Sequence, residues 1–115
     1  MLSRDQKIVL LGGAGLVGQN LVWLLREQGF DNLVIVDKHA ANSAILRSQH
    51  PDLAIRVADM AEPGAWQDDL AGAGAVVMLQ AQIGGEVERE FQRNNIDATR
   101  HALEACRRHH VSRLV

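Results

Sequence analysis

The chain has 115 residues, of which 47% are hydrophobic and 23% are charged, and its formal net charge is −2. This composition suits one soluble globular domain and gives no electrostatic argument for a nucleic-acid partner. No apolar run approaches the roughly 20 residues of a membrane span, and the polar start Met1–Gln6 is unlike a signal peptide. The lone cysteine, Cys106, cannot form an internal disulfide, which favours a reducing compartment such as the cytoplasm.

The first informative segment is a short apolar run that leads into closely spaced glycines. Lys7–Leu11 predicts a buried strand, and Gly12, Gly15 and Gly18 follow at intervals of three residues. Apolar residues then recur at three- and four-residue spacing, which predicts a helix over Leu16–Gln28. The first turn of such a helix has backbone N–H groups without intrahelical partners, and it carries the positive end of the helix dipole. It therefore attracts a pyrophosphate.

The rest of the chain alternates between apolar β-branched runs and helical patterns. Gly29 is expected to cap the first helix in the left-handed conformation. Further strands are expected at 33–36, 55–58 and 75–79, and helices at 42–49, 63–70 and 86–109. Residues 113–115 are typical of the opening of another strand. This alternation predicts an α/β fold, in which a parallel sheet carries helices on both faces, and one domain over 1–115.

The long helix expected at 86–109 carries two apolar stripes. The first is formed by Phe91, Asn95, Ala98, Ala102 and Ala105, and the second by Ile96, Thr99, Leu103 and Cys106. A helix with one buried face needs only one stripe. The second stripe therefore indicates either a broad face covered by neighbouring chain or a contact between two subunits, as in a homodimer.

Two other patterns carry less weight. The five histidines are scattered and have no cysteine at zinc-like spacing, so we expect no metal site. Arginines give the long helix a basic side, but no aromatic residues are interleaved for base stacking, so we interpret it as a solvated face.

Several segments together resemble one enzyme family. They are Gly12–Gly18, Val34–Asp37, Ala58–Met60, Val76–Ala81 and Asn95–Arg100 with Leu103–Ala105. The chain resembles the extended short-chain dehydrogenases/reductases, also called the NAD-dependent epimerase/dehydratase family, over almost its whole length. It is similar to only the first half or less of such an enzyme. The resemblance implies a Rossmann-like sheet of strand order 3-2-1-4 with the start of strand five, incomplete relative to a full doubly wound domain.

The resemblance assigns the glycine-rich turn to the cofactor's diphosphate. The cradle would consist of Gly12, Gly13, Ala14, Gly15, Leu16, Val17 and Gly18. Gly12 permits the tight turn, Gly15 lets the diphosphate approach the backbone, and Gly18 allows close packing of helix on strand. The alternative is a glycine-rich turn that binds nothing.

The ends of the second and third strands would hold the adenosine half. By resemblance Asp37 accepts hydrogen bonds from the ribose hydroxyls, which favours NAD because a 2′-phosphate would meet like charge. Lys38 follows directly and leaves NADP open. Asp59 would accept from the adenine amino group, with Met60 against the ring. The alternatives are a solvated strand-end residue for Asp37 and a helix N-cap for Asp59.

The loop after the fourth strand would lie along the nicotinamide ribose. It contains Leu79, Gln80 and Ala81, and Gln80 departs from the Ala-Ala pair of many relatives, which leaves the role of its side chain open. Asn95 would tie the long helix to the sheet near the site, a role close to that of an ordinary structural amide.

The resemblance predicts an NAD-dependent epimerase/dehydratase or related oxidoreductase acting on a sugar nucleotide or similar alcohol. The family's catalytic base is a tyrosine with a lysine four residues later, helped by a serine or threonine. The sequence contains no tyrosine. We therefore expect this chain to bind the dinucleotide without turnover, as a fragment of a longer enzyme. Two alternatives stay open: a stand-alone NAD(P)-binding or redox-sensing module, and the N-terminal part of a malate or lactate dehydrogenase.

Overall fold

A parallel sheet forms the centre of the computed structural model, which describes residues 2–80 and 88–115. Within these residues the sheet has the order β3-β2-β1-β4. The strands are β1 (Lys7–Leu11), β2 (Leu33–Asp37), β3 (Ala54–Val57) and β4 (Ala73–Met78). The predicted strand order is thus confirmed, and each strand boundary lies within one or two residues of its expected place.

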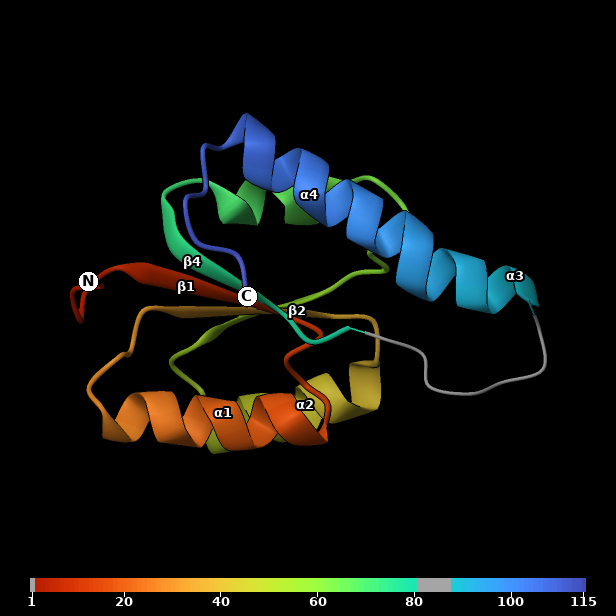
Figure 1. The fold of residues 1–115 in the computed structure, drawn as a ribbon. Coiled ribbons are helices and arrows are strands. Elements are labelled where there is room, and N and C mark those ends of the chain that lie inside the picture. The colour runs from red at the N-terminus through yellow and green to blue at the C-terminus, as the bar shows by residue number, and fades with distance from the viewer. Residues whose placement is uncertain (1, 81–87) are drawn as a thin grey trace.

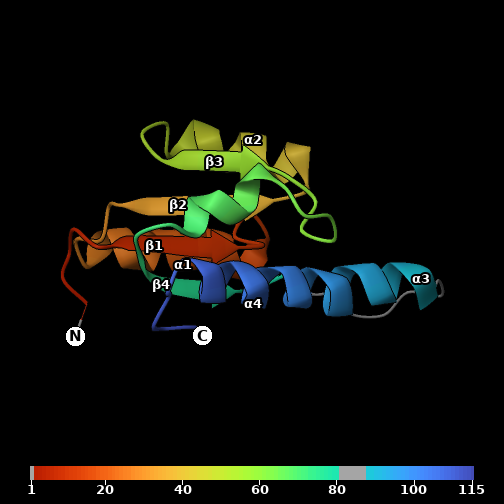
Figure 2. The same ribbon diagram turned by 90° about the horizontal axis from the view of Figure 1, so that it is seen from above.

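Helices cover both faces of the sheet (Figure 1). One face carries α1 (Leu16–Glu27) and α2 (Ala40–Gln49), and the other carries η1 (Ala65–Leu70) and a long helix in three parts. The three parts are α3 (Glu88–Phe91), η2 (Gln92–Asp97) and α4 (Ala98–Arg108). Figure 2 shows that the long helix runs beyond the ends of the strands.

Alternating side chains of the strands supply two cores. Val9 and Leu11 of β1 face the long helix, where they join the buried Trp66, and Ile8 and Leu10 face α1 and α2. Strands buried on both faces are typical of parallel sheets, because helices cover each side. This explains the nearly continuous apolar runs of β1 and β2.

The last residues of the chain add to the sheet. Leu114 forms a parallel bridge with Val76, and the Val115 carbonyl accepts a hydrogen bond from the Met78 N–H (2.8 Å). The expected start of a fifth strand is therefore confirmed beside β4.

The helices differ in detail from the prediction. The segment expected at 63–70 is a tight 3-10 helix that begins at Ala65, and the helix expected from Asn42 begins at Ala40. The long helix is not a regular α-helix throughout, because Gln92–Asp97 adopts the wider π form. Its expected first residues, Glu86 and Val87, lie outside the described residues.

The two stripes of the long helix are also placed differently. Ala98, Ala102 and Ala105 pack on the sheet as expected, but Phe91 of the same stripe is 45% exposed. Cys106 was assigned to the second stripe, yet it is buried with the alanines, and burial raises the pKa of its thiol. Cys106 is thus a packing residue. The buried face of the long helix is wide enough to include this member of the second stripe as well as the alanines of the first.

A buried histidine lies on the opposite face of the molecule from the long helix. His50, 2% exposed, follows α2, and its ring stacks at a tilt on Trp23 with 4.4 Å between the centroids. Arg26 lies 3.1 Å from His50 Nδ1. Because arginine only donates, Nδ1 accepts and Nε2 carries the proton. Burial lowers the pKa of His50, and the Arg26 charge lowers it further.

The lowered pKa of His50 predicts a loss of stability in mild acid. A histidine that resists protonation when folded stabilises the protein above its ordinary pKa of 6.5, and this contribution is lost as the pH falls through the folded-state value. Denaturant unfolding between pH 7.5 and 5 should show a falling free energy of unfolding. The fall should shrink in His50→Gln and persist in His110→Asn, a change at an exposed histidine. An identical fall in all three proteins would contradict this prediction.

Over the described ranges, no helix combines the length and the apolar character that crossing a bilayer requires.

Candidate dinucleotide-binding site

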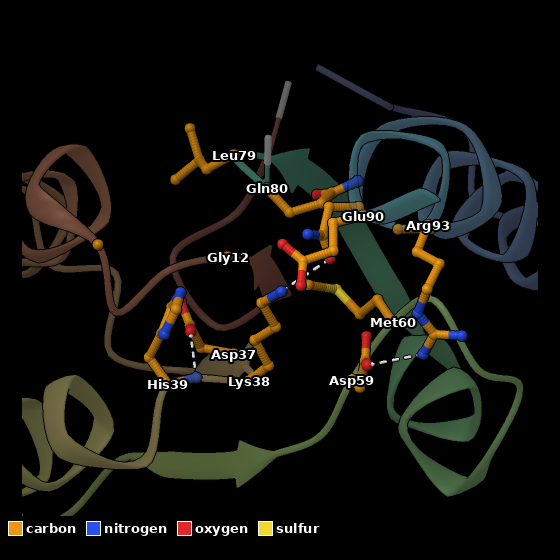
Figure 3. Close-up of a pocket in the computed structure, with 13 residues that line it drawn as sticks. Gly12, Asp37, Lys38, His39, Asp59, Met60, Leu79, Gln80, Glu90 and Arg93 are labelled. Atoms are coloured by element: carbon orange, nitrogen blue, oxygen red, sulfur yellow. Dashed lines mark hydrogen bonds and ion pairs between the residues drawn. The ribbon is translucent and has the colours of Figure 1, made fainter. Parts of the chain in front are cut away.

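A cavity of about 660 Å³ opens at the carboxyl ends of the strands, beneath the long helix (Figure 3). This edge of an open α/β sheet is where ligands bind, and the volume lies within the usual range for small-molecule sites. The cavity is lined by Gly12, Gly15, Asp37, Lys38, His39, Asp59, Met60, Leu79, Gln80, Glu90, Arg93, Asn94 and Ala98.

The turn from β1 into α1 forms the floor of the cavity. Gly12 has a φ of +79° and its N–H donates to the Val36 carbonyl (2.7 Å). A Cβ at Gly12 would lie 2.5 Å from the Gln80 backbone nitrogen. Gly12 is therefore required for both its conformation and its close contact with the end of β4.

Gly15 and Gly18 differ sharply in their surroundings. Gly15 is the N-cap of α1, and a Cβ there would meet only the Gly12 carbonyl oxygen, at 3.7 Å, in otherwise open space. A Cβ at Gly18 would lie 2.2 Å from the Gly13 carbonyl oxygen. Gly18 therefore permits the first turn of α1 to approach the Gly13 backbone, two residues after the end of β1. The open side of Gly15 faces the cavity, where a diphosphate would approach the first turn of α1.

Asp37 ties the glycine turn to the end of β2. The residue is 4% exposed, so the alternative of a solvated strand-end residue is wrong. Its Oδ2 accepts a hydrogen bond from the Ala14 N–H (3.0 Å), and its Oδ1 accepts one from the His39 N–H (2.8 Å, Figure 3). Each carboxylate oxygen can accept a second hydrogen bond, so Asp37 retains capacity for a ligand hydroxyl.

Asp59 is held by a turn and by the long helix. Its Oδ1 accepts from the Ala61 N–H (2.9 Å), and its Oδ2 lies 3.1 Å from the Arg93 guanidinium, which also pairs with Glu62 (2.9 Å). Asp59 thus closes a local turn rather than serving as a helix N-cap. Burial works against ionisation of Asp59, but the Ala61 N–H and the Arg93 charge outweigh it, so its pKa is lowered.

A second bridge crosses the cavity beside the first. The Lys38 ammonium donates to the Asn94 side-chain oxygen (2.7 Å), which joins the end of β2 to η2. Glu90 points its carboxylate into the cavity from α3 (Figure 3). The cavity wall therefore alternates acidic and basic groups and has no uniform charge.

The structure brings together most of the predicted site residues. Gly12, Gly15, Asp37, Lys38, Asp59, Met60, Leu79 and Gln80 line the cavity. The cavity lining does not include Gly13, Ala14, Leu16, Val17 and Gly18, which form the rest of the turn and the first turn of α1. Asn95, on η2, does not line it either. Ala81 lies outside the described residues.

Sequence reasoning placed the long helix near the site through Asn95 but missed the residues of that helix that line the cavity. Glu90, Arg93, Asn94 and Ala98 line the cavity from that helix, and His39 lines it after β2. Glu90, Asn94 and Ala98 are four residues apart in sequence, which places them on one helical face. That spacing was visible, but the sequence did not indicate which face of the helix lies over the strand ends.

Comparisons with known proteins show the family and the fold of the chain. The model of the NAD dependent epimerase/dehydratase family matches residues 8–115. No curated protein sequence matches the chain. Solved structures do match: the UDP-N-acetylglucosamine 4-epimerase of Methanobrevibacter ruminantium M1, in complex with UDP-N-acetylmuramic acid, has a TM-score of 0.82 at 23% identity and covers 97% of this chain and 37% of that one.

Two further structures were solved with NAD. WbmF of Bordetella bronchiseptica, in complex with NAD+ and UDP, has a TM-score of 0.79 at 25% identity, over 96% of this chain and 33% of that one. MoeE5, in complex with UDP-glucuronic acid and NAD, has a TM-score of 0.76 at 28% identity, over 94% and 35%. The chain thus spans about a third of the length of these proteins. By the match over residues 8–115, it belongs to the NAD dependent epimerase/dehydratase family.

Proposed function

We propose that this chain binds NAD in the cavity at the carboxyl ends of the strands. The observation that carries the proposal is the open side of Gly15, which lets an anionic group reach the first turn of α1 without meeting a side chain. The diphosphate would lie over the turn from Gly12 to Gly18, where backbone N–H groups and the helix dipole favour negative charge.

The two halves of the cofactor would lie on opposite sides of that turn. Asp37 at the end of β2 would accept from the adenosine ribose, and Asp59 with Met60 would hold the adenine. Leu79, Gln80 and Ala81 would follow the nicotinamide ribose, and Asn95 would support the helix above. NAD is favoured over NADP because a 2′-phosphate would lie against the Asp37 carboxylate. Lys38, the nearby cation, is already paired with Asn94.

The activity of the family needs groups beyond the cofactor site. NAD supplies hydride transfer when bound, and the protein supplies orientation and acid–base groups. This sequence has no tyrosine to serve as the base. We propose that the chain binds the cofactor and does not turn over by itself. It would then be the NAD-binding part of an enzyme acting on a sugar nucleotide, the class of compound in the complexes of MoeE5 and of the Methanobrevibacter ruminantium epimerase.

We also propose a homodimer through the long helix, in the cytoplasm. Ile96 and Leu103 of that helix are each about half exposed, with relative accessibilities of 49% and 47%. Analytical ultracentrifugation of the chain and of an Ile96→Ser/Leu103→Ser variant should show a dimer only for the unsubstituted chain.

Calorimetric titration tests the cofactor assignment. NAD should bind at one site per chain, NADP should bind more weakly, and UDP-sugars incubated with the chain and NAD should be recovered unchanged by chromatography, with no NADH absorbance. Equal heats for NAD in the chain and in Gly15→Val would overturn the assigned cavity. Conversion of a UDP-sugar to another compound, or production of NADH, would overturn the statement about turnover.

A further inference from the structure

One side chain of the cavity has unsatisfied hydrogen-bonding groups. Gln80 follows β4 and lines the cavity, and its side chain runs toward the helix that bears Glu90 (Figure 3). Among the described residues, neither its Oε1 nor its Nε2 has a hydrogen-bond partner, although both atoms are shielded from solvent. Buried amides are normally paired, so this exception needs a physical explanation.

Another glutamine in the same chain shows the usual arrangement. Gln67 is buried, its Nε2 donates to the His101 carbonyl (3.0 Å) and its Oε1 accepts from the Gly64 N–H (3.2 Å). The amide atoms of both glutamines are shielded from solvent, although Gln80 as a whole is only partly buried, and only Gln67 has partners for both groups among the described residues. The difference is that Gln80 borders the cavity and Gln67 does not.

The two unpaired groups of Gln80 determine which groups of a ligand can form hydrogen bonds with its side chain. A carboxamide offers one acceptor and one donor group, and phosphate oxygens would satisfy only the donor. A hydroxyl both donates and accepts, so a ribose diol can satisfy both. Gln80 also lies next to the diphosphate cradle, because its backbone nitrogen is the atom closest to the Cβ position of Gly12.

We propose that Gln80 is a positioning residue for the dinucleotide, whose carboxamide pairs with the hydroxyls of the ribose on the β4 side of the diphosphate. The inference rests on the proposed binding of NAD. A rotation of the side chain carries the amide from its shielded place into the cavity, and gaining two hydrogen bonds favours that rotation in the liganded state. The side chain then fixes the half of the cofactor that lies farthest from Asp37.

Two substitutions separate the amide's hydrogen bonds from its volume. Gln80→Met keeps the length and removes both groups, whereas Gln80→Glu keeps the acceptor and adds negative charge. Gln49→Met on the exposed end of α2 is the matched control. Each protein is titrated with NAD and with ADP, which lacks the second ribose.

The expected result is a loss of NAD affinity of about tenfold in Gln80→Met, the size of one or two lost hydrogen bonds, with ADP affinity changed less than twofold. Gln80→Glu should lose less than Gln80→Met, and Gln49→Met should match the unsubstituted chain. Unchanged or tighter NAD binding in Gln80→Met would overturn the inference, because the amide would then only fill space.

Other outcomes are equally decisive. Equal losses for NAD and ADP, or a larger loss in Gln80→Glu than in Gln80→Met, would place the amide on the diphosphate and overturn the ribose assignment. Failure of the unsubstituted chain to bind NAD would defeat the proposed function as well. NAD affinity that does not change when Gln80 is substituted would contradict this inference but not the proposed function.

Discussion

Replacing Gly15 by valine is expected to abolish NAD binding while the fold persists. Gly15 has a φ of −73°, which any residue adopts, and its Cβ position is open, so valine adds no strain to the chain. The added methyl groups would occupy the place where the diphosphate meets the first turn of α1. Losing two charge-assisted hydrogen bonds removes about 3 kcal/mol or more, which weakens binding at least ~100-fold.

Calorimetry with NAD and a thermal melt test both halves of this prediction. Gly64→Val is the matched control, because Gly64 is also extended, has open space at its Cβ position and lies outside the cavity. It should bind NAD as the unsubstituted chain does. Gly18→Val should instead lower the melting temperature, since its Cβ would overlap the Gly13 backbone. NAD affinity that survives in Gly15→Val would contradict the assigned cradle.

Replacing Asp37 by alanine should weaken both the fold and the cofactor site. The Ala14 and His39 N–H groups would lose their acceptor, which should cost about 2–4 kcal/mol of unfolding free energy. Loss of the carboxylate should also weaken NAD by ~1–3 kcal/mol, or roughly 5- to 150-fold, and weaken NADP less. Denaturant unfolding and calorimetric titration measure the two effects separately.

A milder substitution at the same position distinguishes a loss of contacts with the cofactor from unfolding of the chain. Asp37→Asn has one acceptor oxygen, so it should keep one of the two backbone hydrogen bonds and lose about half the stability that Asp37→Ala loses. Asp5→Ala, at an exposed position, should leave both measurements unchanged. Equal losses of NAD and NADP affinity in Asp37→Asn would show that Asp37 stabilises the turn without forming hydrogen bonds with the adenosine ribose.

Asp37 illustrates why a site can be located from sequence before its contacts are known. Its place at the end of a strand, about twenty residues after the glycines, predicted a residue that faces the cofactor. That spacing could not show that the same carboxylate accepts from Ala14 across the turn, because this contact depends on how closely β1 and β2 lie side by side.

The sequence by itself determined the succession of strands and helices, the glycine turn and the two acidic strand ends. These features depend on local backbone conformation and on the periodicity of apolar residues, both of which are written in neighbouring positions. The expected boundaries consequently fell within a few residues of the observed ones wherever the structure describes them.

Only the tertiary structure decided which groups meet around the cavity. The pairing of Arg93 with Asp59 joins residues 34 positions apart, and that of Lys38 with Asn94 joins residues 56 positions apart. The π form of Gln92–Asp97 was likewise not predicted. The shielding of the Gln80 amide from solvent is also decided only by the tertiary structure. Such contacts depend on the height and angle at which the long helix crosses the strand ends. That geometry is set by the packing of Ala98, Ala102 and Ala105 on the whole sheet rather than by any local pattern.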